Sequence, residues 1–374
     1  MKIGLFTLEI GRKVGGLEVY EANLIQALAR VDSGNEYHVF CLDPRVREIL
    51  GPLADNFHYH VLPVNRYRGV LWDAPQAMAR ERLDLFHALF VPPPFTSVPY
   101  VITHHGSEVM ERPDFYPFGL GLRMRVLFRR GFKQARLIIG VSAYVYDYLT
   151  SVRGLPRERV RMIPDGSGAG FHAMDKLAAR REVASRYGLE QPYIITVGRI
   201  EPRKNPVRVL EAFDKFRRSV ANAPRLVFAG MKTWSARDFD RTIQRLGLKG
   251  FIVELGYVPD GHLPSLYAAA EFAVFASLWE GFGYPALEAF ATGTALLSSR
   301  TTSLPEVCGD AALLVDPYSV EEIASAMASL HNDPRLREEL IHKGHARAAL
   351  FSWDRTARET VSAYQAAAHP AIGR

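Results

Sequence analysis

Two glutamates, Glu280 and Glu288, lie eight residues apart on either side of a glycine-rich turn. The apolar run before the turn, Phe272 to Ser277, is typical of a buried strand, and Pro285 suits the first turn of a helix. The turn is therefore a predicted strand-to-helix loop. We expect Glu280 in the loop and Glu288 in the first turn of the helix, so that both carboxylates can face one crevice.

The residue types in this turn suit a ligand that carries both phosphate and hydroxyl groups. Gly283 lets the backbone approach a ligand, and the N–H groups of Phe282 to Tyr284 and of the helix start suit phosphate oxygens. A carboxylate accepts hydrogen bonds from paired hydroxyls, such as those of a sugar or a ribose. The alternative is structural: a solvated glutamate and a second one favoured by the helix dipole.

A second charged corner follows the predicted strand that begins at Tyr193. Gly198 and Arg199 come directly after the strand, Lys204 follows, and Pro206 opens the next helix. Fixed positive charge at such a position can bind a diphosphate and stabilise the negative charge on a departing phosphate oxygen. Taken alone, the same residues also fit a solvated basic loop.

Two features of the N-terminal half add weaker candidates. Gly15 and Gly16 precede an apolar-periodic helix and permit backbone contact with a diphosphate, although a glycine pair at a helix entry is more often plain turn chemistry. His104 and His105 follow the apolar run from Val98 to Thr103. Because neighbouring residues on an extended segment point to opposite sides, only one of the two histidines can enter a site.

Apolar runs alternate with helical patterns along the whole chain, which predicts parallel sheets covered by helices on both faces. The predicted strands of the N-terminal half are 3–8, 37–42, 57–64, 83–89, 98–105, 137–141 and 160–164. Those of the C-terminal half are 193–198, 226–230, 251–256, 272–277, 295–298 and 312–315. Ligands of such sheets bind beyond the carboxyl ends of the strands, where both charged corners lie.

Composition limits the class of protein. A length of 374 residues fits two domains, and a net charge of +6 with a pI near 9.2 favours anionic ligands. We expect no nucleic-acid partner, because no module for it is present. Cys41 and Cys308 give no disulfide framework, and neither a signal peptide nor a membrane span is evident, so we expect a cytoplasmic protein.

One basic segment, residues 123–133, carries apolar residues at helical spacing. It could lie on an anionic membrane, as an enzyme acting on a lipid-linked acceptor would require. The alternative is a helix packed through Leu122, Val126, Leu127 and Phe132, with its charges in water.

The segment EGFGYPALEAFATG, which begins at Glu280, resembles the signature of the retaining glycosyltransferases of the GT-B fold, family 4, the glycogen-synthase-like or group 1 type. Further similarities are Gly198-Arg199 with Lys204, the Thr103-His104-His105-Gly106 segment, and the loop through Val258. The resemblance covers almost the whole chain. It selects His105 rather than His104 as the histidine of the site.

The resemblance implies an α/β fold of two Rossmann-like doubly wound domains facing across a cleft. An acceptor domain would span residues 1–180, and a nucleotide-sugar domain would span residues 181–350. The helix within 351–374 would pack back on the first domain, and the charged helix 175–187 would link the two.

The resemblance also implies hexose transfer from a nucleotide-diphosphate sugar to a saccharide or lipid-linked acceptor, with retention and without a cofactor or metal. The implied catalytic residues are Arg199, Lys204, Glu280 and His105. The implied donor-binding residues are Gly15, Gly16, Gly198, Val258, Phe282, Gly283, Tyr284 and Glu288.

Other functions fit similar twin domains. A nucleotide-sugar epimerase would need no acceptor, a phosphorylase would need inorganic phosphate, and a non-catalytic binding protein would keep the fold alone. The presence of all four charged residues, Arg199, Lys204, Glu280 and Glu288, counts against a non-catalytic binding protein. Polysaccharide or glycolipid synthesis is the expected setting, while the donor base, the sugar and the acceptor are not encoded in any motif.

Overall fold

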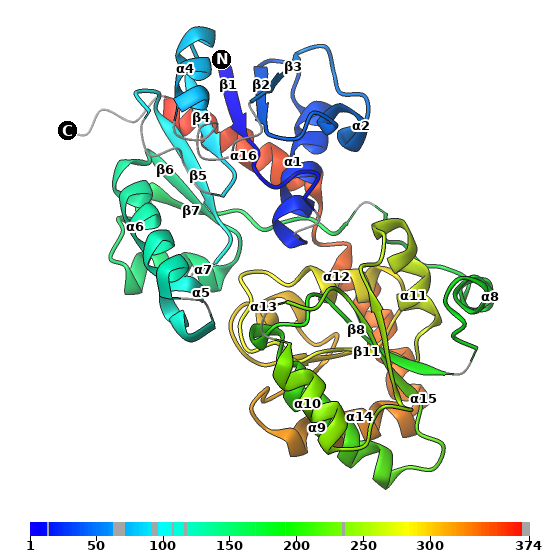
Figure 1. The fold of residues 1–374 in the computed structure, drawn as a ribbon. Coiled ribbons are helices and arrows are strands. Elements are labelled where there is room, and N and C mark those ends of the chain that lie inside the picture. The colour runs from blue at the N-terminus through cyan, green and yellow to red at the C-terminus, as the bar shows by residue number, and fades with distance from the viewer. Residues whose placement is uncertain are drawn as a thin grey trace. The chain divides into compact units, whose positions relative to one another are not determined.

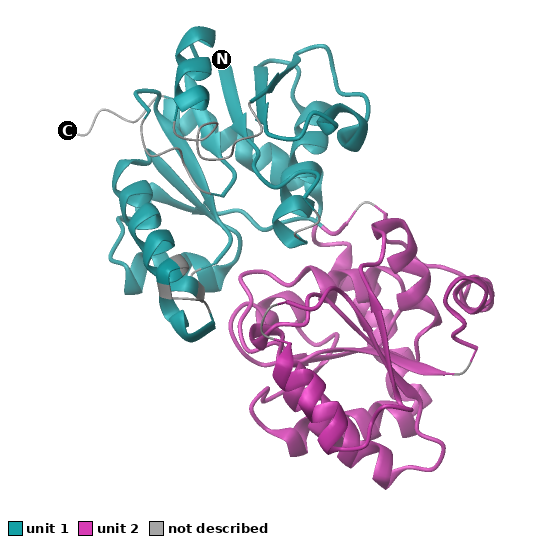
Figure 2. Ribbon diagram, in the orientation of Figure 1, with its two compact units in different colours: residues 1–166, 352–374 teal, residues 167–351 magenta. Residues whose placement is uncertain are grey.

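The computed structural model describes residues 1–12, 15–62, 72–90, 96–106, 108–115, 118–168, 170–190, 192–233 and 236–368. The chain forms two compact units, shown in Figure 2. Unit 1 comprises Met1–Gly166 and Ser352–Arg374, and unit 2 comprises Ser167–Phe351.

Unit 1 is built on a parallel sheet with the strand order β3-β2-β1-β4-β5-β6-β7 (Figure 1). Its strands are β1 (Lys2–Phe6), β2 (Glu36–Cys41), β3 (Phe57–Val61), β4 (Leu85–Ala88), β5 (Tyr100–His104), β6 (Leu137–Gly140) and β7 (Val160–Met162). Each overlaps a predicted apolar run. The chain leaves β1 in one direction and returns at β4 on its other side, so the β1/β4 boundary is the topological switch point of this sheet.

Helices cover this sheet. They are α1 (Gly16–Val31), α2 (Val46–Leu50), α4 (Ala74–Glu81), α5 (Glu108–Glu111), α6 (Phe118–Gln134), α7 (Ala143–Asp147) and the C-terminal α16 (Trp353–Ala368). Helix α16 packs along α1, although more than 300 residues separate them, and thus completes unit 1 as the resemblance implied.

A buried polar chain ties α16 to the sheet. The two nitrogens of His87 on β4 lie 2.7 Å from the Tyr364 hydroxyl of α16 and 2.8 Å from the Thr103 hydroxyl of β5. The hydroxyl of Tyr20 on α1 lies 2.9 Å from the same Thr103 oxygen. Burial lowers the pKa of His87 to about 3, so the imidazole is neutral and needs both partners.

Unit 2 has its own parallel sheet, in the order β10-β9-β8-β11-β12-β13. Its strands are β8 (Tyr193–Val197), β9 (Arg225–Ala229), β10 (Ile252–Gly256), β11 (Phe272–Phe275), β12 (Leu296–Ser299) and β13 (Leu313–Val315). All six overlap the predicted runs, and the central strands β8, β11 and β12 are the apolar, largely buried ones, as expected for strands covered on both faces. The topological switch point lies between β8 and β11, where Phe272 pairs with Ile194.

Helices also cover the sheet of unit 2. Helices α9 (Pro206–Ser219), α10 (Arg237–Arg245) and α14 (Val320–Asn332) share one apolar core with the sheet. The others are α8 (Lys176–Tyr187), α11 (Leu263–Ala269), α12 (Tyr284–Ala291), α13 (Leu304–Cys308) and α15 (Pro334–Ala348). Among the described residues, no helix has the length and apolar character needed to cross a bilayer.

The boundary between the units falls at 166/167 rather than at 180/181. Helix α8, expected to be a link, packs against α11 inside unit 2, and the Tyr187 hydroxyl lies 2.8 Å from His262 Nδ1. The chain passes between the units at two neighbouring points, since Ser167 N donates to Phe351 O at 3.1 Å. Apolar periodicity alone does not show which sheet a helix will cover.

The polar chain through His87 predicts the effect of a single hydroxyl. Tyr364→Phe leaves one nitrogen of a buried imidazole without a partner and should lower the free energy of unfolding by about 1–3 kcal/mol. Urea unfolding followed by circular dichroism measures this. The control is Tyr59→Phe, because the buried Tyr59 hydroxyl makes no hydrogen bond within the described residues and its loss should cost little. Equal losses in the two variants would contradict the role of the chain.

Candidate functional site

The two charged corners predicted from the sequence meet at the switch point of the unit 2 sheet. Strands β8 and β11 are hydrogen-bonded neighbours, so the loops after their carboxyl ends, residues 198–205 and 276–283, lie side by side. In open parallel sheets the loops diverge at such a point and leave a crevice for a ligand.

Backbone and amide contacts join the two loops. Leu278 N donates to Arg203 O at 2.8 Å. Asn205, which is buried and has a left-handed φ of 61°, donates from Nδ2 to Ala276 O at 3.0 Å and to Pro317 O at 2.7 Å. Asparagine tolerates this backbone conformation better than most residues, so Asn205 can turn the chain while its side chain hydrogen-bonds to the neighbouring loops.

Glu280 is the electrostatic centre of the site. Its carboxylate binds Lys204 Nζ at 2.7 Å through one oxygen and Arg203 Nη1 at 2.8 Å through the other. Burial would raise the pKa of Glu280, but the charges of Arg203 and Lys204 outweigh it and lower that pKa. Burial lowers the pKa of Lys204, whereas Glu280 opposes the decrease. The arrangement holds an ionised carboxylate and a nearly buried ammonium group in fixed positions.

Arg203 was not singled out from the sequence, although it lies in the predicted basic loop. It also binds Glu201 at 2.8 Å and donates to Trp279 O at 3.3 Å. Its position beside Lys204 and two residues after Glu201 was the available signal. Because Arg203 and Lys204 each bind a different oxygen of the Glu280 carboxylate, Glu280 orients the basic loop.

The turn after Glu280 is shaped by residues of a third loop. Ser303 Oγ donates to Glu280 O at 3.0 Å and to Phe282 O at 2.7 Å, and Glu280 N donates to Thr302 Oγ1 at 3.1 Å. Gly283 has a φ of 123°, and a Cβ there would lie 2.7 Å from a Leu304 methyl carbon. Only glycine fits this turn. Sequence analysis gave no sign of Ser303, which acts across a long sequence separation.

Glu288 lies deeper in the helix than predicted. It is the fifth residue of α12, in the second turn rather than the first. The carboxylate is buried and accepts a hydrogen bond from the Tyr267 hydroxyl at 2.9 Å. Burial raises the pKa of Glu288 to about 7; the Tyr267 hydrogen bond opposes this, Asp260 adds to it, and the charge of Lys204 opposes it. The charge of Lys204 thus acts on Glu288 as well as on Glu280.

The remaining predicted residues of unit 2 surround this centre in different ways. Arg199 follows β8, and its side chain is exposed. Gly198 has a φ of 130°, and a Cβ there would lie in ordinary contact with Lys204 Cε at 3.5 Å, so this glycine packs beside the lysine stem. Val258 is buried after β10, and Phe282 packs against Tyr284 and Phe351. The functions of these residues stay predictions.

The β1–α1 loop of unit 1 contains Gly15 and Gly16, both exposed at the start of α1, where Gly15 has a φ of 86°. The preceding residues are held by Glu21, whose carboxylate accepts hydrogen bonds from the backbone N–H groups of residues 8, 9 and 10 at 2.9–3.1 Å. Glu18 accepts another from Gly11 at 2.8 Å. Sequence analysis passed over both glutamates because they fit ordinary helix positions.

The histidine pair divides as expected from an extended segment. His104 is fully buried against Phe128 and Phe132, whereas His105 is partly exposed and packs edge-on against Tyr20. His105 Nε2 donates to Leu89 O at 2.8 Å, which leaves Nδ1 as the other functional atom of the ring. Burial lowers the pKa of His105 to about 4, so the ring is neutral at pH 7. Its part in catalysis stays a prediction.

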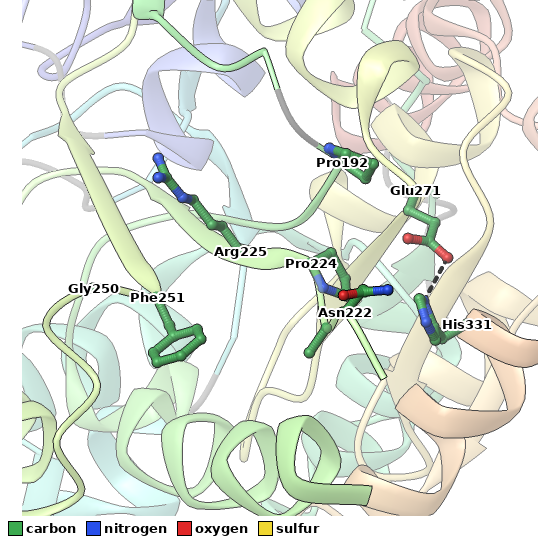
Figure 3. Close-up of a pocket in the computed structure, with 9 residues that line it drawn as sticks. Pro192, Asn222, Pro224, Arg225, Gly250, Phe251, Glu271 and His331 are labelled. Carbon is green, nitrogen blue, oxygen red and sulfur yellow. Dashed lines mark hydrogen bonds and ion pairs between the residues drawn. The ribbon is translucent and has the colours of Figure 1, made fainter. Parts of the chain in front are cut away.

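A hollow of about 440 Å³ lies at the other end of the unit 2 sheet (Figure 3). Pro192, Arg225 and Phe251 line it, and all three are at the amino ends of strands. His331 Nδ1 lies 2.9 Å from Glu271 Oε1 there. Because ligands of parallel sheets bind beyond the carboxyl ends, this hollow is not the predicted site.

Comparison with known families decides the class of protein. Residues 180–347 match the family model of glycosyl transferases group 1, and residues 14–167 match that of Glycosyltransferase Family 4. The chain belongs to these group 1, family 4 glycosyltransferases. It is therefore an enzyme, and the charged corner of unit 2 lies within the segment matched to the group 1 model.

Three proteins are similar to this glycosyltransferase over nearly its whole length. The O-antigen chain mannosyltransferase B of Escherichia coli is 29% identical over 382 residues, covering 98% of this chain and 100% of that protein. Sucrose-phosphate synthase from Thermosynechococcus elongatus has a TM-score of 0.79 at 21% identity, over 98% of both chains. Anabaena HepE in complex with UDP-glucose has a TM-score of 0.79 at 16% identity, over 98% of this chain and 100% of that one. These structures confirm the GT-B fold.

The raised pKa of Glu288 predicts how the stability of this glycosyltransferase depends on pH. A carboxyl group with a higher pKa in the folded state stabilises fully below its unfolded pKa of 4.5, and this stabilisation is lost as pH rises through about 7. Glu288→Gln stays neutral and can still accept from Tyr267. Its stability relative to wild type should therefore rise between about pH 5 and about pH 8 in urea unfolding. The exposed Glu338→Gln is the control, and an unchanging difference for Glu288→Gln would contradict the shift.

Proposed function

We propose that this glycosyltransferase moves a hexosyl group from a nucleoside-diphosphate sugar to a saccharide or lipid-linked acceptor, with retention and without a metal. The buried Lys204–Glu280 pair beside Glu288, at the switch point of the unit 2 sheet, is the observation that supports this best. It supplies a fixed cation for phosphate and a separate carboxylate for hydroxyl groups.

The charged residues of unit 2 bind different parts of the nucleoside-diphosphate sugar. Lys204 and Arg199 bind the diphosphate, and their charge matters most when the glycosyl–phosphate bond breaks and negative charge develops on the leaving oxygen. Glu288 in its ionised form accepts hydrogen bonds from the ribose hydroxyls. Glu280 keeps Lys204 oriented and, with the backbone of Phe282 to Tyr284, contacts the transferred sugar or its phosphate.

The unit 1 residues complete the proposal. Gly15 and Gly16 offer backbone N–H groups at the start of α1, and a Cβ on Gly15 would meet no described atom within 4 Å, which suits a close approach of a phosphate group. His105 presents Nδ1 as a hydrogen-bond acceptor because its Nε2–H is directed to Leu89 O. A neutral acceptor suits a sugar hydroxyl better than a phosphate oxygen.

For the sugar we propose mannose, in the synthesis of a polysaccharide. The full-length relative from Escherichia coli is named as an O-antigen chain mannosyltransferase, and the match leaves no part of that protein uncovered. The competing functions make different demands: an epimerase would convert the donor without an acceptor, and a phosphorylase would depend on inorganic phosphate.

A panel of nucleoside-diphosphate sugars, with GDP-mannose and UDP-glucose among them, tests the donor through thermal shift and through release of nucleoside diphosphate. Arg199→Ala and Lys204→Ala should each lower kcat by about 10²-fold and change donor affinity less, because their charge acts mainly in the transition state. Lys215→Ala is the control, since Lys215 pairs with Glu321 on the surface of unit 2.

Two outcomes would contradict this function. Stabilisation by a donor without any transfer or hydrolysis would contradict transfer from that donor. Unchanged kcat in either the Arg199 or the Lys204 variant would remove the transition-state role of that residue.

We further propose that α6 touches an anionic membrane. Phe128 and Phe132 face the interior, but Leu122 and Val126 are 51% and 58% exposed, one helical turn apart. The alternative of a helix packed through Leu122, Val126, Leu127 and Phe132 therefore holds for the buried Phe132 but is wrong for Leu122 and Val126. Exposed Arg129 lies on the same helix, and apolar side chains beside basic ones are what an anionic bilayer surface binds.

Vesicle co-sedimentation tests this contact. Replacing Leu122 and Val126 together by serine should weaken binding to phosphatidylglycerol vesicles by about tenfold, since two apolar side chains leave the membrane. Val152→Ser is the control because Val152 is equally apolar and 71% exposed, also in unit 1. Equal binding by the double variant and wild type would contradict the contact.

A further inference from the structure

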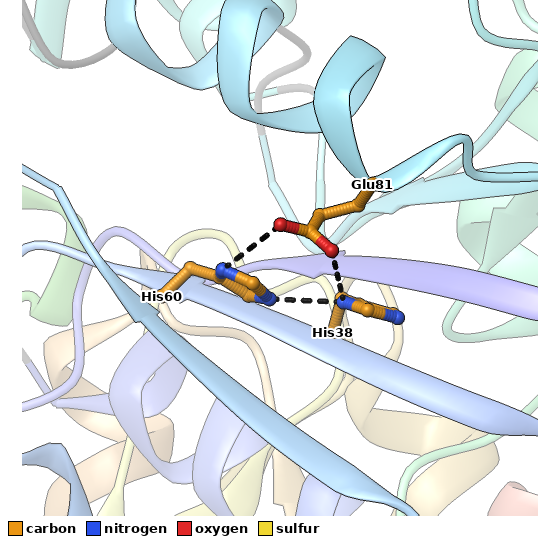
Figure 4. Close-up of side chains that lie close together, drawn as sticks. All are labelled: His38, His60 and Glu81. Atoms are coloured by element: carbon orange, nitrogen blue, oxygen red, sulfur yellow. Dashed lines mark hydrogen bonds and ion pairs between the residues drawn. The ribbon is translucent and has the colours of Figure 1, made fainter.

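Three side chains from distant parts of unit 1 converge on one face of its sheet (Figure 4). His38 is on β2, His60 is on the edge strand β3, and Glu81 is the last residue of α4. Each can offer one ligand atom, and these atoms all lie within 4.8 Å of one another. The group is distinct from the predicted donor site, because its strand residues lie within β2 and β3 rather than in the loops beyond their carboxyl ends.

The backbone positions that create the cluster are determined by the sheet and by one glycine. Phe40 is paired with His60, which places His60 diagonally across from His38 on the neighbouring strand. Gly4 is paired with His38 on the other side, and a Cβ there would lie 2.6 Å from a Leu83 methyl carbon. The absence of a side chain at Gly4 thus lets the segment after α4 approach the sheet.

The contacts within the cluster are incomplete as hydrogen bonds. His38 Nδ1 and His60 Nε2 are 2.9 Å apart, so one of these two nitrogens carries the proton and donates it to the other. The Glu81 carboxylate faces both rings, but its oxygens are 3.8 Å from His38 Nδ1 and 3.9 Å from His60 Nδ1. Those separations exceed hydrogen-bond distance.

The same separations suit a bound metal ion. Ligand atoms about 2.0–2.2 Å from a tetrahedral Zn²⁺ are about 3.3 Å from each other. The observed 2.9 Å and 3.8 Å lie on either side of that value, so small side-chain rotations would complete the geometry. Two imidazoles and one carboxylate form a donor set that zinc accepts, with a fourth position for water.

An outer carboxylate already orients the most buried ligand. Glu36 Oε1 lies 3.1 Å from His38 Nε2, where it accepts the Nε2 proton and leaves the Nδ1 lone pair directed at the cluster. Carboxylates in this position are typical of metal-binding histidines. His38 is 4% exposed, whereas His60 and Glu81 are 23% and 29% exposed, so an ion can enter from their side.

We propose that His38, His60 and Glu81 form a binding site for Zn²⁺ or a divalent cation of similar chemistry, which cross-links β2, β3 and α4. Metal binding replaces the His38–His60 hydrogen bond, and the proton on His60 Nε2 moves to Nδ1 of the same ring. The ion is structural: it attaches an edge strand to the neighbouring strand and to a helix, and it takes no part in glycosyl transfer.

Calorimetric titration of the metal-stripped, tag-free protein with ZnCl₂ tests the site, with the visible absorption of the Co²⁺ complex reporting its geometry. Wild type should bind one ion and show a higher Tm with zinc. His60→Gln and Glu81→Gln should each weaken binding by at least about 100-fold, and Glu36→Gln by about 10–100-fold. Circular dichroism confirms that each variant is folded.

His58→Gln is the matched control. His58 lies two residues from His60 on the same strand, its ring is 5.3 Å from that of His38, and its Nε2 is 3.5 Å from Glu36. It is outside the proposed ligand set, so its loss should change the affinity less than threefold or so. The proposal is overturned if wild type binds no stoichiometric zinc, if His60→Gln and Glu81→Gln bind as wild type does, or if His58→Gln loses the ion equally.

Discussion

The ion pair between Lys204 and Glu280 is the interaction on which the site of unit 2 depends. Neither charge could stay in so little solvent alone, because breaking a buried ion pair typically costs about 3–5 kcal/mol. Arg203 shares the same carboxylate, and Asn205 fixes the loop that carries both cations. The position of the positive charge is therefore set before any ligand arrives, which is the condition for electrostatic catalysis.

Much of this could be predicted from the sequence because parallel strands buried on both faces appear as continuous apolar runs, and their carboxyl ends mark the loops that matter. Lys204 and Glu280 were found in this way. The depth of Glu288 was misjudged because α12 begins one residue before Pro285. Ser303 and the contact between Arg203 and Glu280 were missed because the partners are far apart in sequence, and no periodic pattern reports such contacts.

What sequence patterns did not predict in unit 1 has the same origin, contacts between distant segments. Spacing showed that His104 and His105 must face opposite sides, and packing against Phe128 and Phe132 shows that His104 is the interior one. The His38, His60 and Glu81 cluster depends on strand pairing and on space made by Gly4, so the separation of its residues along the chain gave no sign of it. Local patterns identify elements, whereas sites that join three elements require the fold.

A crystal structure of the enzyme with a bound nucleoside diphosphate tests the central claim most directly. The account predicts the diphosphate at the carboxyl ends of β8 and β11, with its oxygens on Lys204 and Arg199 and the ribose hydroxyls on Glu288. Phosphates bound away from Lys204, or a nucleotide in the hollow beside Asn222 and His331 at the amino ends of the strands, would contradict it.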